Sequence, residues 1–368
     1  MRILVPVDIG DFRTSNPFVV EMLKSLQSHS SVHSVQHGVF WLDVPDAKWD
    51  IVHIQWPESL CPGVEPQQEH ISRLREQLAK LKPHARIVVT VHNLSVHYRH
   101  SAAFDALYRT VFEAADAFVH FSDYSIELIH QSYYEVAEGK PHIQIPHGNY
   151  ECFGNAPTQL SARKQLNLPS HKTILLVFGQ LRAFEEFALA RSAIKHWPVP
   201  EKTLLICGRL PVRPLSMRLS RLMLHIVGGL RTFVLLLRSK LTRNLILHEK
   251  RVAADEVAAY CTAADIFLIP RKEILNSGNI ALGFTYGKVV VGPDVGNVGE
   301  ILKRHENPVF DPDSIDSLIS ALSKALVAAR SGRGDSNRKI AIEKWNWGTV
   351  AEMHVNLYED LLGREKRV

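Results

Sequence analysis

Short, nearly continuous apolar runs alternate with amphipathic stretches along the whole chain. The apolar runs have the length of strands and fall into two series: Ile3–Val7, Ile51–Ile54, Ile87–Val91, Ala117–Phe121 and Ile143–Ile145, then Ile174–Phe178, Thr203–Cys207, Ile266–Ile269 and Val289–Gly292. Between them lie helical patterns such as Phe18–Gln27, Glu69–Lys80 and Phe104–Ala114. Strands that are apolar on both faces and alternate with helices are typical of parallel sheets covered by helices. The pattern therefore predicts an α/β chain with two doubly wound domains.

The length of the chain also favours two domains. A chain of 368 residues exceeds a comfortable length for one hydrophobic core. The polar stretch "NAPTQLSARKQLNLPSHK" (155–172) separates the two series of strands, and we interpret it as a linker. The first domain is then predicted to span 1–154 and the second to begin at 173. In such sheets ligands bind outside the carboxyl ends of the strands, so functional residues are expected there.

The composition is that of a globular protein, with 46% hydrophobic and 22% charged residues. The cysteines show neither CxxC nor metal-ligand spacing, which favours buried thiols in a reducing compartment. The sequence "MRILVPVDIG" begins directly with a strand pattern, so we expect no signal peptide. No run of 18 or more uninterrupted apolar residues occurs, so no membrane span is expected. These features predict a cytoplasmic protein.

One basic and strongly apolar segment, 211–244, interrupts the second series. Between Leu210 and His248 there are seven Arg and Lys residues and no acidic residue. Such a segment can lie in a membrane interface and is attracted to anionic lipid, which predicts peripheral attachment to the inner face of the membrane. The alternative is a helix buried in the second domain whose arginines bind a phosphorylated ligand. Nucleic acid is an unlikely partner because the basic residues alternate with Leu and Val rather than with aromatic residues.

Polar clusters follow the strands of the first series. They are contained in "GDFRTSNPF", "HIQWPESL", "VTVHNLSVHY" and "QIPHGNYECF". The candidate residues in these clusters are Asp11, Asn16, Trp56, Glu58, His92, His97, His147 and Tyr150. Because the carboxyl ends of parallel strands meet at one edge of a sheet, these loops are expected to form the floor of a cleft. For any single His or Glu, a capping or core hydrogen-bonding role is the alternative.

Two loops of the second series have the residues of an anion site. "VFGQLR" places a glycine turn and Arg182 after a strand, and "IPRKEILNSGNIALGF" places Arg271, Lys272, Asn276, Ser277 and Gly278 before a helix. The first N–H groups of a helix have no internal partner, and Arg and Lys are the usual phosphate partners. Neither loop is a G-x-x-x-x-G-K-[ST] or G-x-G-x-x-G motif. We therefore expect a diphosphate; an ordinary strand-to-helix turn is the alternative.

The order of motifs resembles that of glycosyltransferases of the GT-B fold. The similar segments are "IPHGNYECF", "VFGQLR", "AAYCTAADIFLIP" and "KWNWGTVAEMHVNLYEDLL". The resemblance implies two Rossmann-like doubly wound domains facing across a cleft, the first binding the acceptor and the second (173–345) binding a nucleotide sugar. It also implies a C-terminal helix, 346–368, that crosses back to the first domain.

Several positions depart from the retaining branch of that family. Its two donor-site glutamates correspond to Ile274 and Leu282, and its cationic pair corresponds to Gln180 and Glu185. A closer resemblance is to the xanthan-type β-mannosyltransferase, through "NPF", "VHIQWPESL", "VTVHNLSVH", "PHGNYECF", "FGQLR" and "PRKEILNSGNIALGF". That resemblance implies an inverting transfer of mannose from GDP-mannose to a polyprenyl-diphosphate-linked or oligosaccharide acceptor in bacterial exopolysaccharide synthesis.

The residues and the resemblance together give a site hypothesis. The diphosphate is expected to contact Arg182, Lys272 and the segment Asn276–Gly278, which would replace a metal, so no metal or other cofactor is expected. An inverting transfer needs a general base. Glu58 is the first candidate, because a carboxylate beside Trp56 would be partly desolvated. His92, which could instead bind the donor, and Asp11 are the other candidates for the base. The residues expected to bind substrate are Asn16, Trp56, His97 and Tyr150.

Other functions stay open at this point. With both family glutamates replaced, the chain could be a non-catalytic partner that binds a nucleotide sugar or glycolipid in an assembly complex. It could also be a transferase that uses a UDP-sugar, or an enzyme that hydrolyses or epimerises a nucleotide sugar. A selective nucleotide effect on stability would separate these possibilities.

Overall fold

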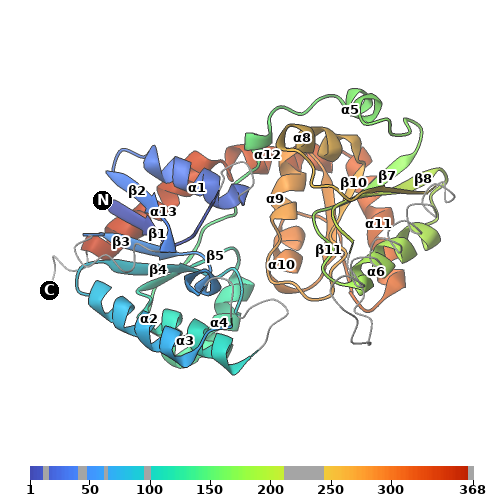
Figure 1. The fold of residues 1–368 in the computed structure, drawn as a ribbon. Coiled ribbons are helices and arrows are strands. Elements are labelled where there is room, and N and C mark those ends of the chain that lie inside the picture. Colours follow the sequence, from blue (N-terminus) through green and yellow to red (C-terminus); the bar gives the residue numbers. More distant parts are fainter. Residues whose placement is uncertain (11–15, 40–47, 62–64, 95–100, 211–243, 364–368) are drawn as a thin grey trace, which may run out of the picture. The chain divides into compact units, whose positions relative to one another are not determined.

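A computed structural model describes residues 1–10, 16–39, 48–61, 65–94, 101–210 and 244–363 (Figure 1). The chain divides into two compact units, Met1–Gly148 with Lys344–Val368, and Asn149–Glu343. In the described residues, each unit contains one sheet of six parallel strands. The predicted α/β class with two doubly wound sheets is thereby confirmed.

The sheet of the first unit has the strand order β2-β1-β3-β4-β5-β6. These strands are β2 (Ser34–His37), β1 (Arg2–Val5), β3 (Ile51–Ile54), β4 (Arg86–Thr90), β5 (Ala117–His120) and β6 (His142–Gln144). The residues of β3 and β5 are buried throughout, as expected for strands covered on both faces. β2 was not predicted from the sequence, because this half-buried edge strand contains Val35 as its one apolar residue.

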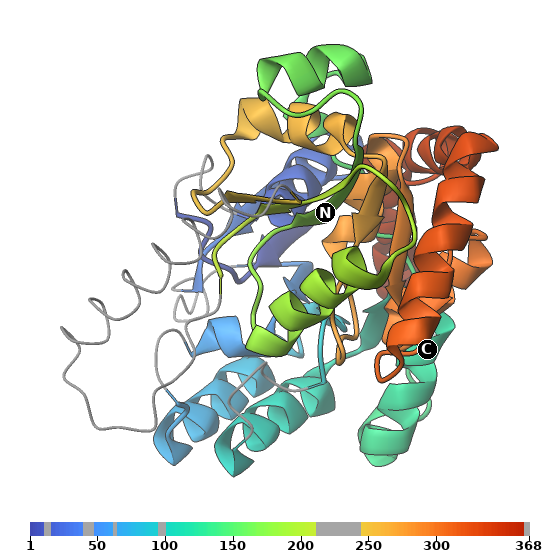
Figure 2. The ribbon, with the colours of Figure 1, turned by 90° about the vertical axis from the view of Figure 1, so that its right-hand side faces the viewer.

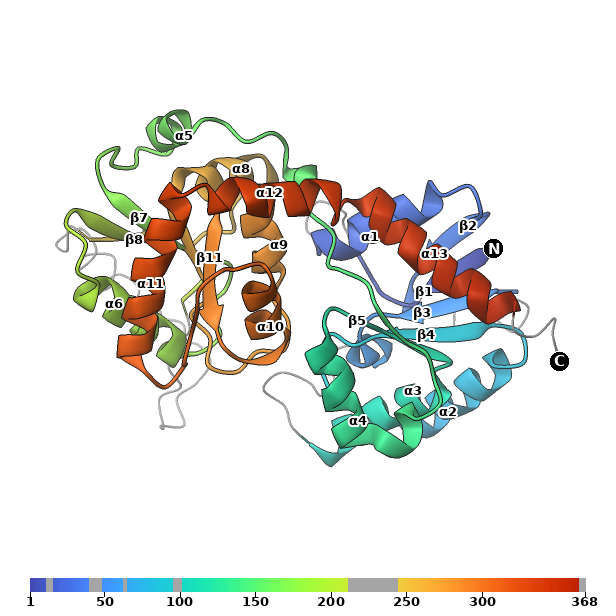
Figure 3. The same cartoon turned by 180° about the vertical axis from the view of Figure 1, so that it is seen from behind.

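Helices cover both faces of this sheet (Figures 1 and 3). One face carries α1 (Pro17–Gln27) and α13 (Trp347–Gly363), which pack against each other. The other face carries α2 (Gln68–Leu81), α3 (Ala102–Ala114) and α4 (Asp123–Ala137). Below α13, the buried ring of His53 lies 2.6 Å from Tyr358 Oη and 2.8 Å from Thr90 Oγ1. The C-terminal helix is therefore part of the first unit.

The sheet of the second unit has the order β12-β11-β10-β7-β8-β9. These strands are β12 (Val309–Phe310), β11 (Val289–Pro293), β10 (Ile266–Leu268), β7 (Thr173–Phe178), β8 (Lys202–Cys207) and β9 (Leu245–His248). Neither edge strand was predicted from the sequence. β9 directly follows the basic segment and has the same apolar composition, and β12 has only two residues.

Helices also cover both faces of the second sheet. Figures 1 and 3 show α9 (Gly278–Thr285) and α10 (Gly296–Arg304) on one face, and α6 (Phe184–His196) and α11 (Ile315–Arg330) on the other. Figure 2 views the unit from the side of α6 and shows α11 beside it. The main core of the unit lies between these two helices and the sheet and includes Trp197, which is fully buried. Two further helices, α8 (Ala254–Ala263) and α12 (Arg333–Glu343), complete the unit.

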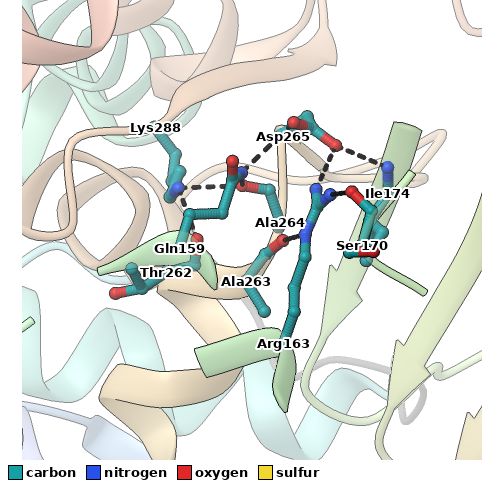
Figure 4. Close-up of polar contacts among 9 residues, drawn as sticks. All are labelled: Gln159, Arg163, Ser170, Ile174, Thr262, Ala263, Ala264, Asp265 and Lys288. Carbon is teal, nitrogen blue, oxygen red and sulfur yellow. Dashed lines mark hydrogen bonds and ion pairs between the residues drawn. The ribbon is translucent and has the colours of Figure 1, made fainter. Parts of the chain in front are cut away.

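The segment 155–172, interpreted as a linker from its composition, contains α5 (Gln159–Gln165) packed on α8. The guanidinium of Arg163 donates to the carbonyl oxygens of Ala263 and Ser170 and pairs with Asp265 at 2.7 Å (Figure 4). The junction with the first unit falls between Gly148 and Asn149, rather than after 154. Buried polar contacts thus attach this polar stretch to the second unit.

The basic segment 211–244 lies outside the described residues except for Asn244. In the part of the chain that the structure describes, no helix combines the length and the hydropathy needed to cross a bilayer.

Candidate functional site

In the first unit, Gln55, Trp56 and His92 come together at the carboxyl edge of the sheet. β3 and β4 are neighbouring parallel strands, so the residues that follow them lie close together. Gln55 Oε1 lies 3.0 Å from Nε2 of His92. The indole ring of Trp56 stacks on the imidazole, with 4.3 Å between centroids and 22° between the planes. The ring of His92 is therefore fixed by a hydrogen bond at one nitrogen and by an aromatic face.

Aromatic side chains surround the imidazole ring of His92, and its burial keeps the ring uncharged. Phe18 of α1 meets the imidazole edge-on at 5.4 Å between centroids, and Phe121 lies at 5.3 Å. Burial lowers the pKa of His92 to about 3, and the nearby His147 adds to this effect. The ring is consequently neutral at physiological pH. His92 can take part in hydrogen bonds there but cannot supply a positive charge.

Glu58 lies in a short 3₁₀ helix, η2 (Pro57–Leu60), and its side chain bonds to α3. The hydroxyl of Tyr108, which is fully buried, donates to Glu58 Oε2 at 2.6 Å. Burial raises the pKa of Glu58, and the hydrogen bond from Tyr108 opposes this rise. Trp56 was expected to desolvate this carboxylate, but its indole stacks on His92, and the hydrogen-bond partner of Glu58 is Tyr108. The raised pKa is that of a carboxylate suited to accept a proton.

The other residues predicted for the first unit have different outcomes. Asn16 is exposed and caps α1, because its Oδ1 accepts a hydrogen bond from the backbone N–H of Phe18 at 3.2 Å. This cap explains the helix start at Pro17. Asp11 and His97 lie outside the described residues. A substrate contact for Asn16 or His97 stays a prediction.

In the second unit, the loop after β10 leads directly into the N-terminus of α9. Ser277 is the N-cap, and its Oγ accepts the N–H of Asn279 at 3.4 Å. Among the described residues, none accepts a hydrogen bond from the backbone N–H of Ser277 or Gly278. Asn276 is held by the buried Asn297 of α10 at 2.6 Å. The loop therefore presents unpaired backbone donors on a fixed support, as an anion site requires.

The side chain of Asn279 ties this loop to β7. Its Nδ2 donates at 2.8 Å to the carbonyl oxygen of Phe178, the last residue of β7. The glycine turn that carries Arg182 begins at the next residue, Gly179, whose φ of +92° disfavours other residue types. A Cβ on Gly208, after β8, would approach the oxygen of Gly179 to 2.1 Å. The loops that follow the neighbouring strands β10, β7 and β8 are thus in contact at the glycine turn after β7.

The cations near this turn fall into two groups. Arg271 is largely buried and pairs with Glu186 of α6 at 3.4 Å. Glu186 also accepts the backbone N–H of Arg182 at 2.7 Å, so this ion pair joins the two loops. Arg182 itself is exposed, and its guanidinium has no ion-pair partner in the described ranges. Lys272 is exposed and pairs with Asp313, whose hydrogen bond raises the pKa of the ammonium group.

Tyr150 belongs to the second unit, although the sequence analysis placed it in the first. Its backbone N–H donates to Thr285 Oγ1 at 3.0 Å, and its carbonyl accepts from the hydroxyl of Tyr286. The Tyr150 ring stacks on Phe153, with 5.7 Å between centroids. This packing gives Tyr150 a structural role; its predicted sugar contact is not tested.

Three further residues belong to these sites but were not selected from the sequence. They are Gln55, Tyr108 and Glu186, and each is the buried partner of a candidate residue. Gln55 lies in "HIQWPESL" between the end of the strand and Trp56. That position directly after a strand is the one sequence feature that could have identified it. Tyr108 and Glu186 lie on helices and follow no strand directly.

Comparisons with known proteins agree with this architecture. No family model matches the chain. A curated relative, named MMP alpha-(1->4)-mannosyltransferase, from Mycolicibacterium hassiacum, is 31% identical over 117 residues. The match spans 31% of this chain and only 26% of that protein.

Similar solved structures extend over nearly the whole chain. Sucrose-phosphate synthase from Thermosynechococcus elongatus has a TM-score of 0.68 and 18% identity, with 99% of both chains covered. The Anabaena protein Alr3699/HepE in complex with UDP has a TM-score of 0.69 and 11% identity, with 98% of this chain and 99% of that one covered. At such identities the similarity concerns the fold. The chain therefore has the two-domain GT-B fold found in glycosyltransferases.

Proposed function

We propose that the protein is a glycosyltransferase that moves mannose from GDP-mannose to a glycan or polyprenyl-diphosphate-linked acceptor in bacterial polysaccharide synthesis. The observation that carries the proposal is the N-terminus of α9 within a GT-B fold, where the backbone N–H groups of Ser277 and Gly278 have no acceptor among the described residues. The partial match to a mannosyltransferase supports the choice of sugar. A nucleoside diphosphate is the leaving group of such a transfer, and its charge must be stabilised as it departs.

The second unit is proposed to hold the diphosphate without a metal. Arg182 and Lys272 are exposed cations on the two loops that Glu186 and Arg271 join. A phosphate that competes with Asp313 for Lys272 displaces only an exposed ion pair, which water and salt already weaken. The N–H groups of Ser277 and Gly278 complete the proposed set of donors.

The first unit is proposed to supply the general base of an inverting transfer. Burial raises the pKa of Glu58, which makes this carboxylate a stronger base toward the proton of an acceptor hydroxyl. His92 is neutral and held between Gln55 and Trp56, which suits a residue that positions a substrate by hydrogen bonding. Asp11 remains a further candidate for the base.

The first test is thermal unfolding with GDP, UDP, ADP, GDP-mannose, UDP-glucose and UDP-glucuronate, with and without Mg²⁺. A ligand at 100 times its Kd stabilises the folded state by about 2.7 kcal/mol. Each kcal/mol raises the midpoint of a unit of this size by about 2–4 °C. The proposal predicts a GDP-selective rise that does not need the metal. If no nucleotide has an effect, a non-catalytic function becomes the better explanation.

The anion site has a matched pair of test variants. Lys272→Ala removes a proposed phosphate partner, whereas Lys303→Ala removes another exposed lysine of the same unit that is paired with an aspartate. Loss of one charge-assisted hydrogen bond is expected to weaken nucleoside-diphosphate binding about tenfold. Lys303→Ala should bind as the wild type does. Equal affinities for the two variants would remove Lys272 from the site.

A UDP-sugar is the second candidate donor, because a structure of similar fold, Alr3699/HepE, is described in complex with UDP. A UDP-selective thermal shift would favour it. The anomeric configuration of the product, determined by NMR, tests the inverting mechanism separately.

Peripheral attachment through 211–244 is proposed from its basic and apolar composition alone. Cosedimentation with anionic and neutral vesicles, with and without this segment, tests that attachment.

A further inference from the structure

A cavity of about 490 Å³ lies between α3 and α4 in the first unit. The two helices pack side by side on the sheet (Figure 1). The volume of the cavity falls within the range of small-molecule sites, about 300–1,000 Å³. The residues that line it are Leu94, Asp105, Ala106, Arg109, Ser132 and Tyr133. None of these residues belongs to the sites described above.

The aromatic wall of the cavity is held in place by its neighbours. α4 departs from helical geometry at Tyr133, where φ is −140° and ψ is 36°. The hydroxyl of Tyr133 donates to the carbonyl oxygen of Leu94 at 3.3 Å, and Phe112 meets the ring edge-on with 5.0 Å between centroids. Leu94 follows His92 by two positions, so this wall joins α4 to the loop after β4 that carries His92. The cavity therefore borders the carboxyl edge of the first sheet.

Two opposite charges of α3 line the cavity without forming an ion pair with each other. The carboxylate of Asp105 is exposed and has no hydrogen bond or ion pair among the described residues. The guanidinium of Arg109, one helical turn further, lies 5.8 Å from the centre of the Tyr133 ring and reaches Glu135 only at 4.0 Å. The hydroxyl of Ser132 is likewise without a partner in the described ranges. The cavity thus presents an acceptor, a donor and a hydroxyl that can do both.

Adjacent hydroxyl groups of a sugar match this set, because each hydroxyl both donates and accepts hydrogen bonds. One hydroxyl can donate to Asp105 while its neighbour accepts from Arg109. An ionised phosphate or carboxylate only accepts, and it would meet the negative charges of Asp105 and Glu135. α3 also carries Tyr108, which bonds to Glu58, so the cavity and the proposed base share one helix.

We propose that this cavity binds an uncharged sugar residue of the acceptor, with Asp105 and Arg109 as its hydrogen-bonding partners. The assignment to the acceptor rests on the proposed transferase function; the binding of a sugar does not.

Fluorine NMR of protein labelled with 3-fluorotyrosine detects a ligand at Tyr133, whose signal is assigned by its loss in Tyr133→Phe. The probes are methyl α-mannopyranoside and methyl β-glucopyranoside, with glucuronate and inorganic phosphate as charged comparisons. The uncharged glycosides are expected to shift the Tyr133 signal with a Kd of about 1 mM, as is usual for ligands of this size. The charged probes should bind at least about tenfold more weakly, because they face two carboxylates. Equal or tighter binding of a charged probe would overturn the choice of an uncharged ligand.

Two cavity variants have matched controls outside the cavity. Asp105→Asn and Arg109→Gln each remove one charge-assisted partner and should weaken glycoside binding about tenfold. Glu113→Gln, also exposed on α3, and Lys80→Gln, exposed on α2, remove the same charges elsewhere and should bind as the wild type does. No shift of the Tyr133 signal with either glycoside, or equal affinities in the cavity and control variants, would refute the site.

Nucleotide binding is measured on the same protein by thermal unfolding with GDP and UDP. Glycoside binding should be unchanged by GDP-mannose or UDP-glucose; its displacement by either would assign the cavity to the donor and refute the proposal. If glycosides bind but no nucleotide has an effect, the proposed transferase function fails while the sugar site stands. If a nucleotide binds but no glycoside does, the cavity proposal fails and the proposed function stands.

Discussion

The contacts of Arg163 allow one prediction about stability to be worked out in full. The guanidinium donates to the carbonyl oxygens of Ala263 and Ser170 at 2.9 and 2.8 Å, and to Asp265 at 2.7 Å (Figure 4). Its side chain is 7% exposed, and that of Asp265 is 26% exposed. Arg163→Met retains most of the apolar stem of the side chain but removes all three hydrogen bonds. We expect the second unit to lose much of its stability.

The magnitude follows from what each group loses. Removing one partner of a buried ion pair typically costs about 3–5 kcal/mol. Asp265 retains hydrogen bonds from the N–H of Ile174 and the amide of Gln159, and water reaches part of its carboxylate. These contacts place the estimate at the lower end, about 3 kcal/mol. That value corresponds to roughly a hundredfold change in the unfolding equilibrium.

The assay uses the fact that Trp197 is the one tryptophan between residues 149 and 343 of the sequence. Its ¹⁹F signal in protein labelled with 5-fluorotryptophan reports urea unfolding of the second unit alone. Arg304→Met is the control, because Arg304 pairs with Glu300 on the surface of α10. Such a pair contributes about 0.3–0.5 kcal/mol. If Arg163→Met shifted the midpoint no further than Arg304→Met, the buried hydrogen bonds of Arg163 would not contribute the stability expected of them.

Three further variants test other parts of the structure. Tyr108→Phe removes a hydrogen bond that lowers the pKa of Glu58, so the acidic limb of the pH–activity profile should move to higher pH; an unmoved limb would exclude Glu58 as the base. Burial lowers the pKa of Lys288 from its usual 10.5 to about 8. Between these values the unfolded state binds more protons, so wild-type stability to urea should rise with pH relative to Lys288→Met; parallel curves would contradict this. Gly148→Ala would place a Cβ 2.3 Å from the ring of Trp347, and we expect a loss of about 1–3 kcal/mol in denaturant unfolding of the first unit. An unchanged midpoint would show that the indole moves at no cost.

The strands of both sheets could largely be predicted from the sequence, because a buried parallel strand must be apolar on both faces. Ile51–Ile54 is such a strand and was predicted with its observed bounds. The edge strands β2 and β12 lack that signal, since one is half-buried and the other has two residues. The segment 155–172 was misleading for a related reason. Its polar composition suggested a linker, but Arg163 and Gln159 find their partners about a hundred residues further along the chain.

The position of the candidate sites was also predictable, whereas their internal contacts were not. Parallel topology alone requires that the loops after β3 and β4 lie close together, which brings Trp56 near His92. The contacts that determine chemistry join residues far apart in sequence: Gln55 with His92 at a separation of 37, and Tyr108 with Glu58 at 50. No local pattern encodes such pairs. They depend on how helices and loops pack on the finished sheet.

Burial separates structural cations from those that remain available to a ligand. Arg271 and Lys272 were both predicted in one anion loop, and composition gives no reason to treat them differently. In the structure Arg271 is 13% exposed, pairs with the buried Glu186 and donates to the carbonyl oxygen of Gln180. Breaking one partner of a buried ion pair is strongly destabilising. Lys272 is half exposed, and its contact with Asp313 competes with water. A diphosphate can therefore take Lys272 from its partner at little cost, whereas taking Arg271 would separate the loops after β7 and β10. The proposed anion site thus uses the exposed cations Arg182 and Lys272, while the buried ion pair keeps the two loops in place.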